Sequence, residues 1–483
     1  MSRVFRSPRL RCCLGFLLAV STPLAAQGPD RSRAPAPGPA PSVTLPPVQT
    51  ARLSNGLRVQ LVEMHEVPLV KIGLVVPAGA AEDPTGKFGV ANLTAAMLDE
   101  GAGTRSALEI AEEVAYLGAT LTTASSYDSS SVTAGVPVAR IEPTLALMAD
   151  VVMHPTFPAA ELERLRTEIL TGMLQARDNP EAIATLAFPR LLYGTAHRYG
   201  TAENGTPESV KAIAVDDLRA FYRTRYRPDT STLIVVGDVT KDQAVPMLER
   251  AFGGWTAEGP PPARANLPDA PQPASRSIVL IDKPGAAQSQ VRIGWVGVPR
   301  STPDYFPLTV ANTLLGGSFT SRLNTNLRET HGYAYGAFSL FAMRREAGPF
   351  FAGAGVQTDK TAESVREFFH EFDAIRTPIP AEEFGKAQRN VALSFPGEFE
   401  TTGDLLARLQ AKVALGLPED VYATYVAKVT SVTPAEASKA MTERVQPSKF
   451  LVVVVGDREK VEAPLRALGL GEVRVMTVEE ALR

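Results

Sequence analysis

Apolar residues repeat along this chain with two periods, and the switches between the periods predict alternating strands and helices. Four apolar, β-branched segments are typical of strands, and they occupy residues 56–62, 70–76, 276–281 and 291–296. Two valine-rich runs each stop at Gly-Asp and lead directly into a helical pattern, within residues 232–252 and 450–468. Strand pairs followed by series of helices predict an α+β fold with largely antiparallel sheets covered by helices.

Several further elements have clear signals. Ser106 and Glu109 form a capping-box pattern, which predicts a helix over residues 106–117. Residues 119–125 and 131–136 alternate like two strands joined by a short turn. A helix is predicted over residues 159–177, with one apolar face made of Leu162, Leu165, Ile169, Leu170, Met173 and Leu174.

The two halves of the chain follow the same order of elements. After its second strand each half continues with a turn and a helical pattern, over residues 89–98 and 306–315. A proline-rich stretch over residues 258–275 is typical of an exposed linker. We therefore predict two tandem homologous domains, over residues 48–257 and 276–470, followed by a C-terminal tail over residues 471–483.

The N-terminal segment has the pattern of an export signal. Four arginines and no acidic residue precede an apolar core, and small residues follow up to Ala26. We expect a signal peptide over residues 1–26, a disordered Pro/Ala-rich leader over 27–47, and an exported, periplasmic protein. The apolar core is too short to span a bilayer, so stable membrane insertion is not expected.

Composition excludes other classes of function. Hydrophobic residues make up 45% and charged residues 21%, which is ordinary for a globular protein. The net charge of −3 offers no basic surface for nucleic acid. Both cysteines, Cys12 and Cys13, lie in the expected signal peptide, so the mature chain would contain neither a disulfide nor a thiolate metal ligand.

The most informative motif lies in the second half. Arg328 and Tyr335 stand seven positions apart, in the string Gly-Gly…Ser-Arg-Leu…Leu-Arg-Glu-Thr-His-Gly-Tyr-Ala-Tyr that begins at Gly316. The simplest interpretation is that Arg328 is a structural arginine and that Tyr335 is a core tyrosine. Both side chains can also donate hydrogen bonds to a peptide carbonyl and stabilise the oxyanion that forms from it. Gly316 and Gly317 are interpreted as the end of a helix.

This string resembles a signature of the insulinase/pitrilysin-type zinc metallopeptidases, which bind zinc through His-x-x-Glu-His on a helix. The resemblance covers most of the mature chain and implies tandem α+β domains of a metallopeptidase-homologue fold. It further implies that Arg328 and Tyr335 hold substrate at a zinc site on another domain. In two-chain members, one chain carries zinc and its partner carries the Arg/Tyr pair.

The zinc motif itself is degenerate in this chain. Its positions read Asn92, Ala95 and Ala96, and the family spacing places the third ligand, a Glu, at Met173. Asn92 is interpreted as a buried polar contact on an apolar helix. The nearest upstream acid to Met173 is Glu168, which local gaps in the spacing could bring into play.

The histidines do not offer a replacement site. A zinc peptidase needs about three protein ligands and an open position for water. The chain has five histidines, and no two lie at helical ligand spacing: His65, His154, His197, His331 and His370. We therefore expect no metal in this chain, and we expect zinc in its partner.

Three hypotheses about function follow. The first is a non-catalytic, substrate-binding subunit that supplies Arg328 and Tyr335 to a zinc-bearing sister chain with an intact His-x-x-Glu-His, the pair cutting extended peptides. The second is a binding or scaffold protein of the same fold with no role in proteolysis. The third is an active peptidase with an unrecognised metal site. Whether the protein takes part in catalysis is thus open at the level of sequence.

Overall fold

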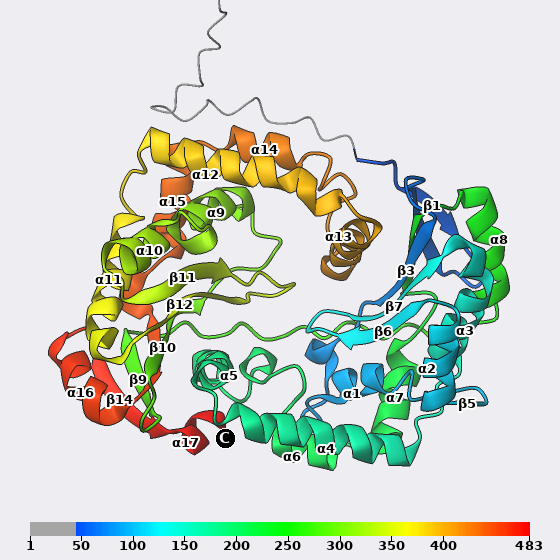
Figure 1. Cartoon of the computed structure of the whole chain (residues 1–483), viewed down its shortest axis with the longest axis horizontal. Helices are drawn as coiled ribbons and strands as arrows, with labels where there is room; N and C mark the ends of the chain where they lie inside the picture. The colour runs from blue at the N-terminus through cyan, green and yellow to red at the C-terminus, as the bar shows by residue number, and fades with distance from the viewer. Residues whose placement is uncertain (1–44) are drawn as a thin grey trace, which may run out of the picture. The chain divides into compact units, whose positions relative to one another are not determined.

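The computed structural model describes residues 45–483. The expected signal peptide and nearly all of the expected leader lie outside the described residues. Within the described part, two six-stranded sheets each carry a set of helices, as Figure 1 shows. A short two-stranded ribbon, β4 (Gly101–Ala102) with β5 (Arg105–Ser106), completes the strands.

The first sheet has the strand order β1-β2-β8-β3-β7-β6. All neighbours are antiparallel except β2 and β8, which run parallel. The valine-rich strand β8 is buried along its whole length, because both faces of the sheet are covered at its centre. The strands are β1 (Gln49–Arg52), β2 (Arg58–Glu63), β3 (Leu69–Val76), β6 (Thr120–Ser125), β7 (Ser130–Pro137) and β8 (Thr232–Gly237).

The second sheet repeats this order as β14-β9-β13-β10-β12-β11. Here β13 takes the place of β8 and is buried throughout, and β9 pairs parallel with both β13 and β14. The predicted duplication and α+β class are therefore confirmed. The strands are β9 (Ser277–Asp282), β10 (Gln288–Val296), β11 (Ala334–Phe341), β12 (Pro349–Gln357), β13 (Leu451–Gly456) and β14 (Glu472–Thr477).

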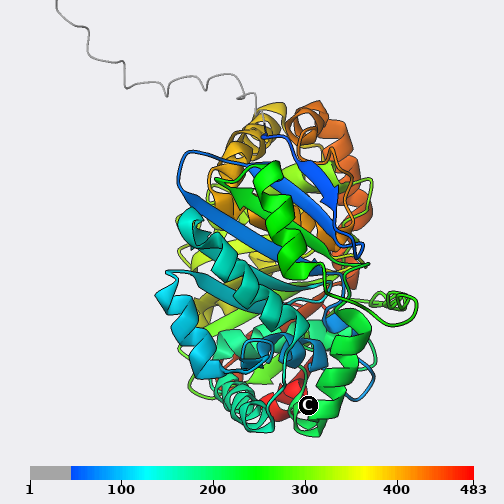
Figure 2. The same ribbon diagram turned by 90° about the vertical axis from the view of Figure 1, so that its right-hand side faces the viewer.

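The helices of the first half follow the predicted order. The capping box of Ser106 and Glu109 opens α2, as predicted. In Figure 2, α3 and α8 lie in front of the blue strands of the first sheet. The helices are α1 (Val90–Ala96), α2 (Ala107–Tyr116), α3 (Ile141–Met153), α4 (Ala159–Ala176), α5 (Pro180–Tyr193), α6 (Pro207–Ala212), α7 (Val215–Arg225) and α8 (Lys241–Phe252).

The second half differs at its first helix. Helix α9 (Tyr305–Asn312) passes into a π-helical segment, Thr313–Gly317, and a second π-helical segment, Thr325–Thr330, carries Arg328. The remaining helices are α10 (Arg322–Asn324), α11 (Thr361–Ala374), α12 (Ala381–Ser394), α13 (Thr402–Leu415), α14 (Tyr425–Ser431), α15 (Pro434–Arg444), α16 (Arg458–Ala467) and α17 (Val478–Leu482).

Each half sends one helix onto the sheet of the other. Helix α5 packs on β10 and β13 of the second sheet, and α13 packs on β3 and β8 of the first, as Figure 1 shows. Phe188 of α5 contributes to a core shared with Val453 and Val455, while Leu406 of α13 contributes to one shared with Ile234. Burying each such large side chain stabilises the fold by about 1.5–3 kcal/mol. The exchange couples the two halves through apolar contact.

Two sequence predictions need correction. Residues 471–483 are not a tail, because β14 completes the second sheet and α17 packs against α5. Leu174 does not belong to the apolar face of α4, since its side chain is 63% exposed. The proline-rich stretch, predicted as an exposed linker, lacks regular structure and most of its residues are exposed.

Hydrogen bonds tie this stretch to both halves. The Ala265 N–H donates to the Glu82 carboxylate at 2.9 Å, and Gln272 Nε2 donates to the Val296 carbonyl at 2.5 Å. The Pro268 carbonyl accepts from His197 Nε2 at 3.0 Å. None of the helices between residues 45 and 483 is both long and apolar enough to cross a lipid bilayer.

Candidate functional site

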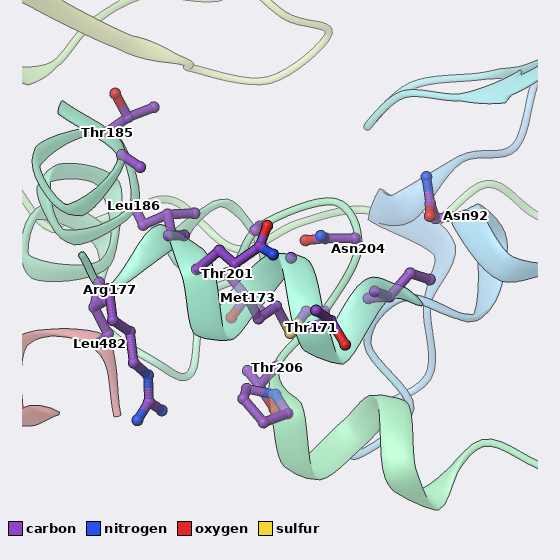
Figure 3. A pocket seen from close by; sticks show the side chains of 18 of the residues that line it. Asn92, Thr171, Met173, Arg177, Thr185, Leu186, Thr201, Asn204, Thr206 and Leu482 are labelled. Atoms are coloured by element: carbon purple, nitrogen blue, oxygen red, sulfur yellow. The ribbon is translucent and has the colours of Figure 1, made fainter. Parts of the chain in front are cut away.

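Two positions of the degenerate zinc motif line a cavity of about 1140 Å³, which is formed mostly by the first half and in part by Leu482 of α17. Asn92 and Ala96 of α1 reach it from one side, Met173 of α4 forms its floor, and α5 contributes Thr185 and Leu186. Figure 3 shows Asn92 on one side of this cavity, Leu186 on the other, and Met173 and Asn204 between them. Met173 and two of the motif positions thus line the same cavity.

The residues of this cavity do not fit a zinc ion. Among residues 45–483 neither a histidine nor a cysteine lines it, and its carboxylates are Glu168 and Glu181. The Glu168 side chain is 72% exposed and faces Arg164, and that of Glu181 is 71% exposed. Ala95, at the position of the family's base, is fully buried. In residues 45–483 no cluster of three His, Cys, Asp or Glu side chains could hold a metal ion.

Asn92 does not make the buried polar contact predicted for it. Its side chain is half-buried, and no hydrogen bond to its amide is seen within the described part of the chain. Asn204 lines the same cavity and is likewise half-buried. Two amides in a largely apolar cavity offer hydrogen bonds to a peptide backbone, but they offer no metal site.

A buried ion pair holds α1 in place. Asp83 accepts from the N–H groups of Gly89 and Ala91 at the start of α1, at 2.7 and 2.9 Å. Arg198 donates to Asp83 at 2.8 Å, and their side chains are 3% and 0% exposed. The carboxylate thus satisfies two free N–H groups of the helix end while Arg198 balances its charge. Sequence reasoning missed this pair, since 115 positions separate its members.

Arg328 lies between two aromatic rings. Its guanidinium carbon is 4.5 Å from the centre of the Phe319 ring and 5.2 Å from that of the Tyr335 ring. Phe319 and Tyr335 are 67% and 87% exposed, so neither is a core residue. The simplest interpretation of Tyr335 is therefore wrong. The rings orient the guanidinium through cation–π contact, and the Glu329 carboxylate lies 3.1 Å from its Nε. In residues 45–483 no hydrogen bond is seen to its terminal N–H groups or to the phenol hydroxyl, so these donors can meet a ligand. Phe319 was not predicted; its only sequence signal is its place just after Gly316 and Gly317.

A β-bulge aims Tyr335 outward. In the pairing of β11 with β12, Ala334 lies opposite Val356 and Ala337 opposite Ala354, so β11 has one extra residue. Ala337 and Ser339 point into the protein, and strict alternation would send Tyr335 to the same face. Because of the extra residue, Tyr335 lies on the opposite face of the strand from Ala337 and Ser339, together with the exposed Phe338 and Leu340.

The outer edge of β11 is closed. Asn324 Oδ1 accepts from the Ala337 N–H and Asn312 Nδ2 donates to the Ser339 carbonyl, both at 3.0 Å. The π-helical segment approaches so closely that a Cβ on Gly316 would lie 2.4 Å from the Ser339 nitrogen, which explains a glycine there. The two asparagine side chains thus occupy backbone N–H and C=O groups with which an added strand would have to pair.

The matching edge strand of the first sheet, β6, is open. All of its residues are exposed or half-buried. In residues 45–483 no hydrogen bond to its outer backbone groups is seen. The two edges of this duplicated fold therefore differ in what they can bind.

Family models match both halves of the chain. Residues 58–204 match the model described as insulinase (peptidase family M16), and residues 212–391 match the peptidase M16 inactive domain. A relative from Bacillus subtilis, the uncharacterized zinc protease YmxG, is 25% identical over 357 residues, which is 73% of this chain and 85% of the relative. The uncharacterized zinc protease SCO5738 of Streptomyces coelicolor is 24% identical, over 80% of this chain and 85% of its own length.

Solved structures share the fold. The peptidase M16 inactive domain from Pseudomonas fluorescens superposes with a TM-score of 0.79 and 28% identity, covering 85% of this chain and 98% of that one. The periplasmic protease PqqL from Escherichia coli gives a TM-score of 0.73 at 16% identity, over 90% of this chain and 50% of that one. With both halves matched by its models and no zinc ligands at the motif positions, the chain belongs to the insulinase family, peptidase family M16, as a member that lacks the zinc motif.

Proposed function

We propose that this chain is the non-catalytic, substrate-binding subunit of a two-chain zinc metallopeptidase. Arg328 and Tyr335 would reach the active site of a sister chain that carries His-x-x-Glu-His and the zinc ion. There they would donate hydrogen bonds to the substrate carbonyl as it becomes an oxyanion. The degenerate cavity at Asn92, Ala95 and Ala96 takes no part in the chemistry.

The exposure of the Arg328–Tyr335 pair is the observation that carries this proposal. A tyrosine that is 87% exposed beside an arginine oriented by two rings contributes little to folding. Such a pair is suited to a ligand that arrives from outside the chain. The open edge of β6 supports the same proposal, because an extended peptide can add to it as a strand.

The proposed location is outside the cytoplasm. The export-signal pattern of residues 1–26 supports it. The resemblance in fold to the periplasmic protease PqqL is compatible with it.

A scaffold or binding protein without proteolytic function is the second candidate. The loss of zinc ligands favours it as much as it favours the subunit hypothesis. The exposed pair distinguishes the two, because a scaffold has no use for oriented hydrogen-bond donors beside an open surface.

The test is co-purification of the chain from its native cell, followed by identification of the bound protein and zinc analysis of both. A sister chain with His-x-x-Glu-His, peptidase activity of the pair, and no activity of either chain alone would support the proposal. A purified chain that cleaves peptides alone in a chelator-sensitive manner would contradict it. A partner without any zinc motif would favour the scaffold.

A further inference from the structure

A second cavity of about 570 Å³ lies in the other half, beside the Arg328–Tyr335 face. It is enclosed by α9, the π-helical segment Thr313–Gly317, the end of β11 and the end of α13. The apolar part of its wall is formed by Leu308, Phe338, Leu340, Phe341, Met343 and Leu415.

Arg300 is the charged group of this cavity. Its side chain is half-buried, and no carboxylate of residues 45–483 lies within 4.0 Å of it, as the ion pairs of the chain show. The nearby acids already have partners: Asp304 pairs with Arg444 at 2.7 Å and Glu398 with Arg408 at 2.9 Å. Arg300 Cζ lies 3.3 Å from the centre of the Tyr305 ring, which holds the guanidinium in place.

The threonine, asparagine and serine side chains of the cavity are hydrogen-bonded within the chain. Thr309 donates to the Tyr305 carbonyl at 2.7 Å, and Thr313 donates to the Thr309 carbonyl at 2.9 Å. The amide of Asn312 is bonded to Ser339. The cavity therefore offers a ligand the guanidinium of Arg300, which matches a carboxylate in shape and charge. Apolar side chains lie beside it.

We propose that this cavity binds the C-terminal α-carboxylate of a peptide, with the last apolar side chain against its walls. The inference deepens the proposed function and rests on it for the peptide. A C-terminal residue brings its carboxylate and side chain on one α-carbon. An internal acidic residue would bring a further peptide group, whose N–H and C=O would lose their hydrogen bonds against apolar walls.

The position of the cavity relates the peptide end to the Arg328–Tyr335 pair. Phe338 and Leu340 line the cavity and lie on the same face of β11 as Tyr335. Tyr335 stands three positions before Phe338 and five before Leu340 on β11, so a peptide held at this cavity would extend along that face towards the pair. Because the outer edge of β11 is closed, the peptide would contact this face through side chains.

Fluorescence polarisation on the purified full chain, without any partner, tests the inference. The probe is a fluorescein-labelled decapeptide that ends in leucine and is neutral apart from its free C-terminus. Amidation of that C-terminus and the substitution Arg300→Gln should each weaken binding roughly 10- to 100-fold, and together no further. Arg389→Gln, which changes an exposed arginine on α12, should leave the affinity unchanged.

Three outcomes would overturn the inference: equal binding of the free and amidated peptides, no effect of Arg300→Gln, or equal binding of an amidated peptide with an internal aspartate. Arg328→Ala should leave the contribution of the carboxylate intact. A chain that binds the free carboxylate through Arg300 but never promotes cleavage by any sister chain would disprove the proposed function alone.

Discussion

The Arg328 guanidinium and the Tyr335 ring lie 5.2 Å apart on the exposed face of the second half. Arg328 stands on a π-helical segment with its side chain half-buried, and Tyr335 stands at a β-bulge that aims it outward. Neither side chain is committed to the core, so their substitution should spare the fold.

In a reconstituted pair with the zinc-bearing chain, Arg328→Ala or Tyr335→Phe should lower turnover by roughly 10²–10³, the usual loss for one oxyanion donor. The loss falls on kcat if the contacts tighten in the transition state, and on KM if they only position the peptide. Kinetics and a melting curve measured together check this. Tyr116→Phe, at a tyrosine that is 78% exposed on α2, is the matched control. Variants that fold, assemble and cut at the parent rate would favour the scaffold instead.

The cavity at α1 can be used to test the assignment of the lost ligands. Asn92→His with Ala95→Glu and Ala96→His should bind zinc weakly, because the third ligand is missing. Adding Met173→Glu should raise the content to about one zinc per chain, measured by elemental analysis after desalting. Ala95→Glu also buries a carboxylate, so a lower melting temperature is expected.

The control for the added ligand is Leu174→Glu, the next residue along α4, whose side chain is exposed and does not line the cavity. It should not raise zinc binding. Tight binding by the three motif changes alone would show that another carboxylate completes the site, with Glu168 as the first to examine.

The buried pair of Asp83 and Arg198 should be important for stability. Asp83→Ala leaves the buried Arg198 guanidinium without its counter-charge, although backbone carbonyls still accept from it, and removes two hydrogen bonds from the start of α1. The expected loss in free energy of unfolding is about 3–5 kcal/mol, measured by urea denaturation. Glu142→Ala, which breaks an exposed ion pair with Arg250, should cost no more than about 1 kcal/mol. Equal effects of the two changes would refute this account.

His197 should make stability depend on pH. Burial lowers its pKa, and its Nδ1 accepts from the Tyr199 N–H while Nε2 donates to the Pro268 carbonyl. Since the folded chain binds this proton less well than the unfolded chain, stability is fully present above the ordinary pKa of about 6.5 and falls as pH decreases below it.

Melting temperatures between pH 7 and pH 5 measure this effect. The decline should be smaller in His197→Gln, which cannot take up the proton, than in the parent or in His154→Gln, at an exposed histidine. Identical profiles for His197→Gln and the parent would show that other groups cause the decline.

The residue pattern was enough to predict the duplication, the α+β class and the family. Continuous apolar runs in residues 232–238 and 450–457, each stopped by Gly-Asp, mark equivalent central strands because such strands are buried on both faces. The substitution of the zinc motif by Asn92, Ala95 and Ala96 could be read directly, since a metal ligand is a property of residue type. These signals depend only on residues close together in the chain, so a single sequence is enough to recognise them.

Contacts between distant residues could not be predicted in this way. The exchange of α5 and α13 between the sheets, the Asp83–Arg198 pair and the fastening of residues 258–275 each depend on segments that only folding brings together. The orientation of Tyr335 is the clearest case. Alternation along β11 would turn it inward, and one extra residue in the pairing with β12 turns it outward. Strand pairing decides that parity, because the side chains of a strand change face with every residue.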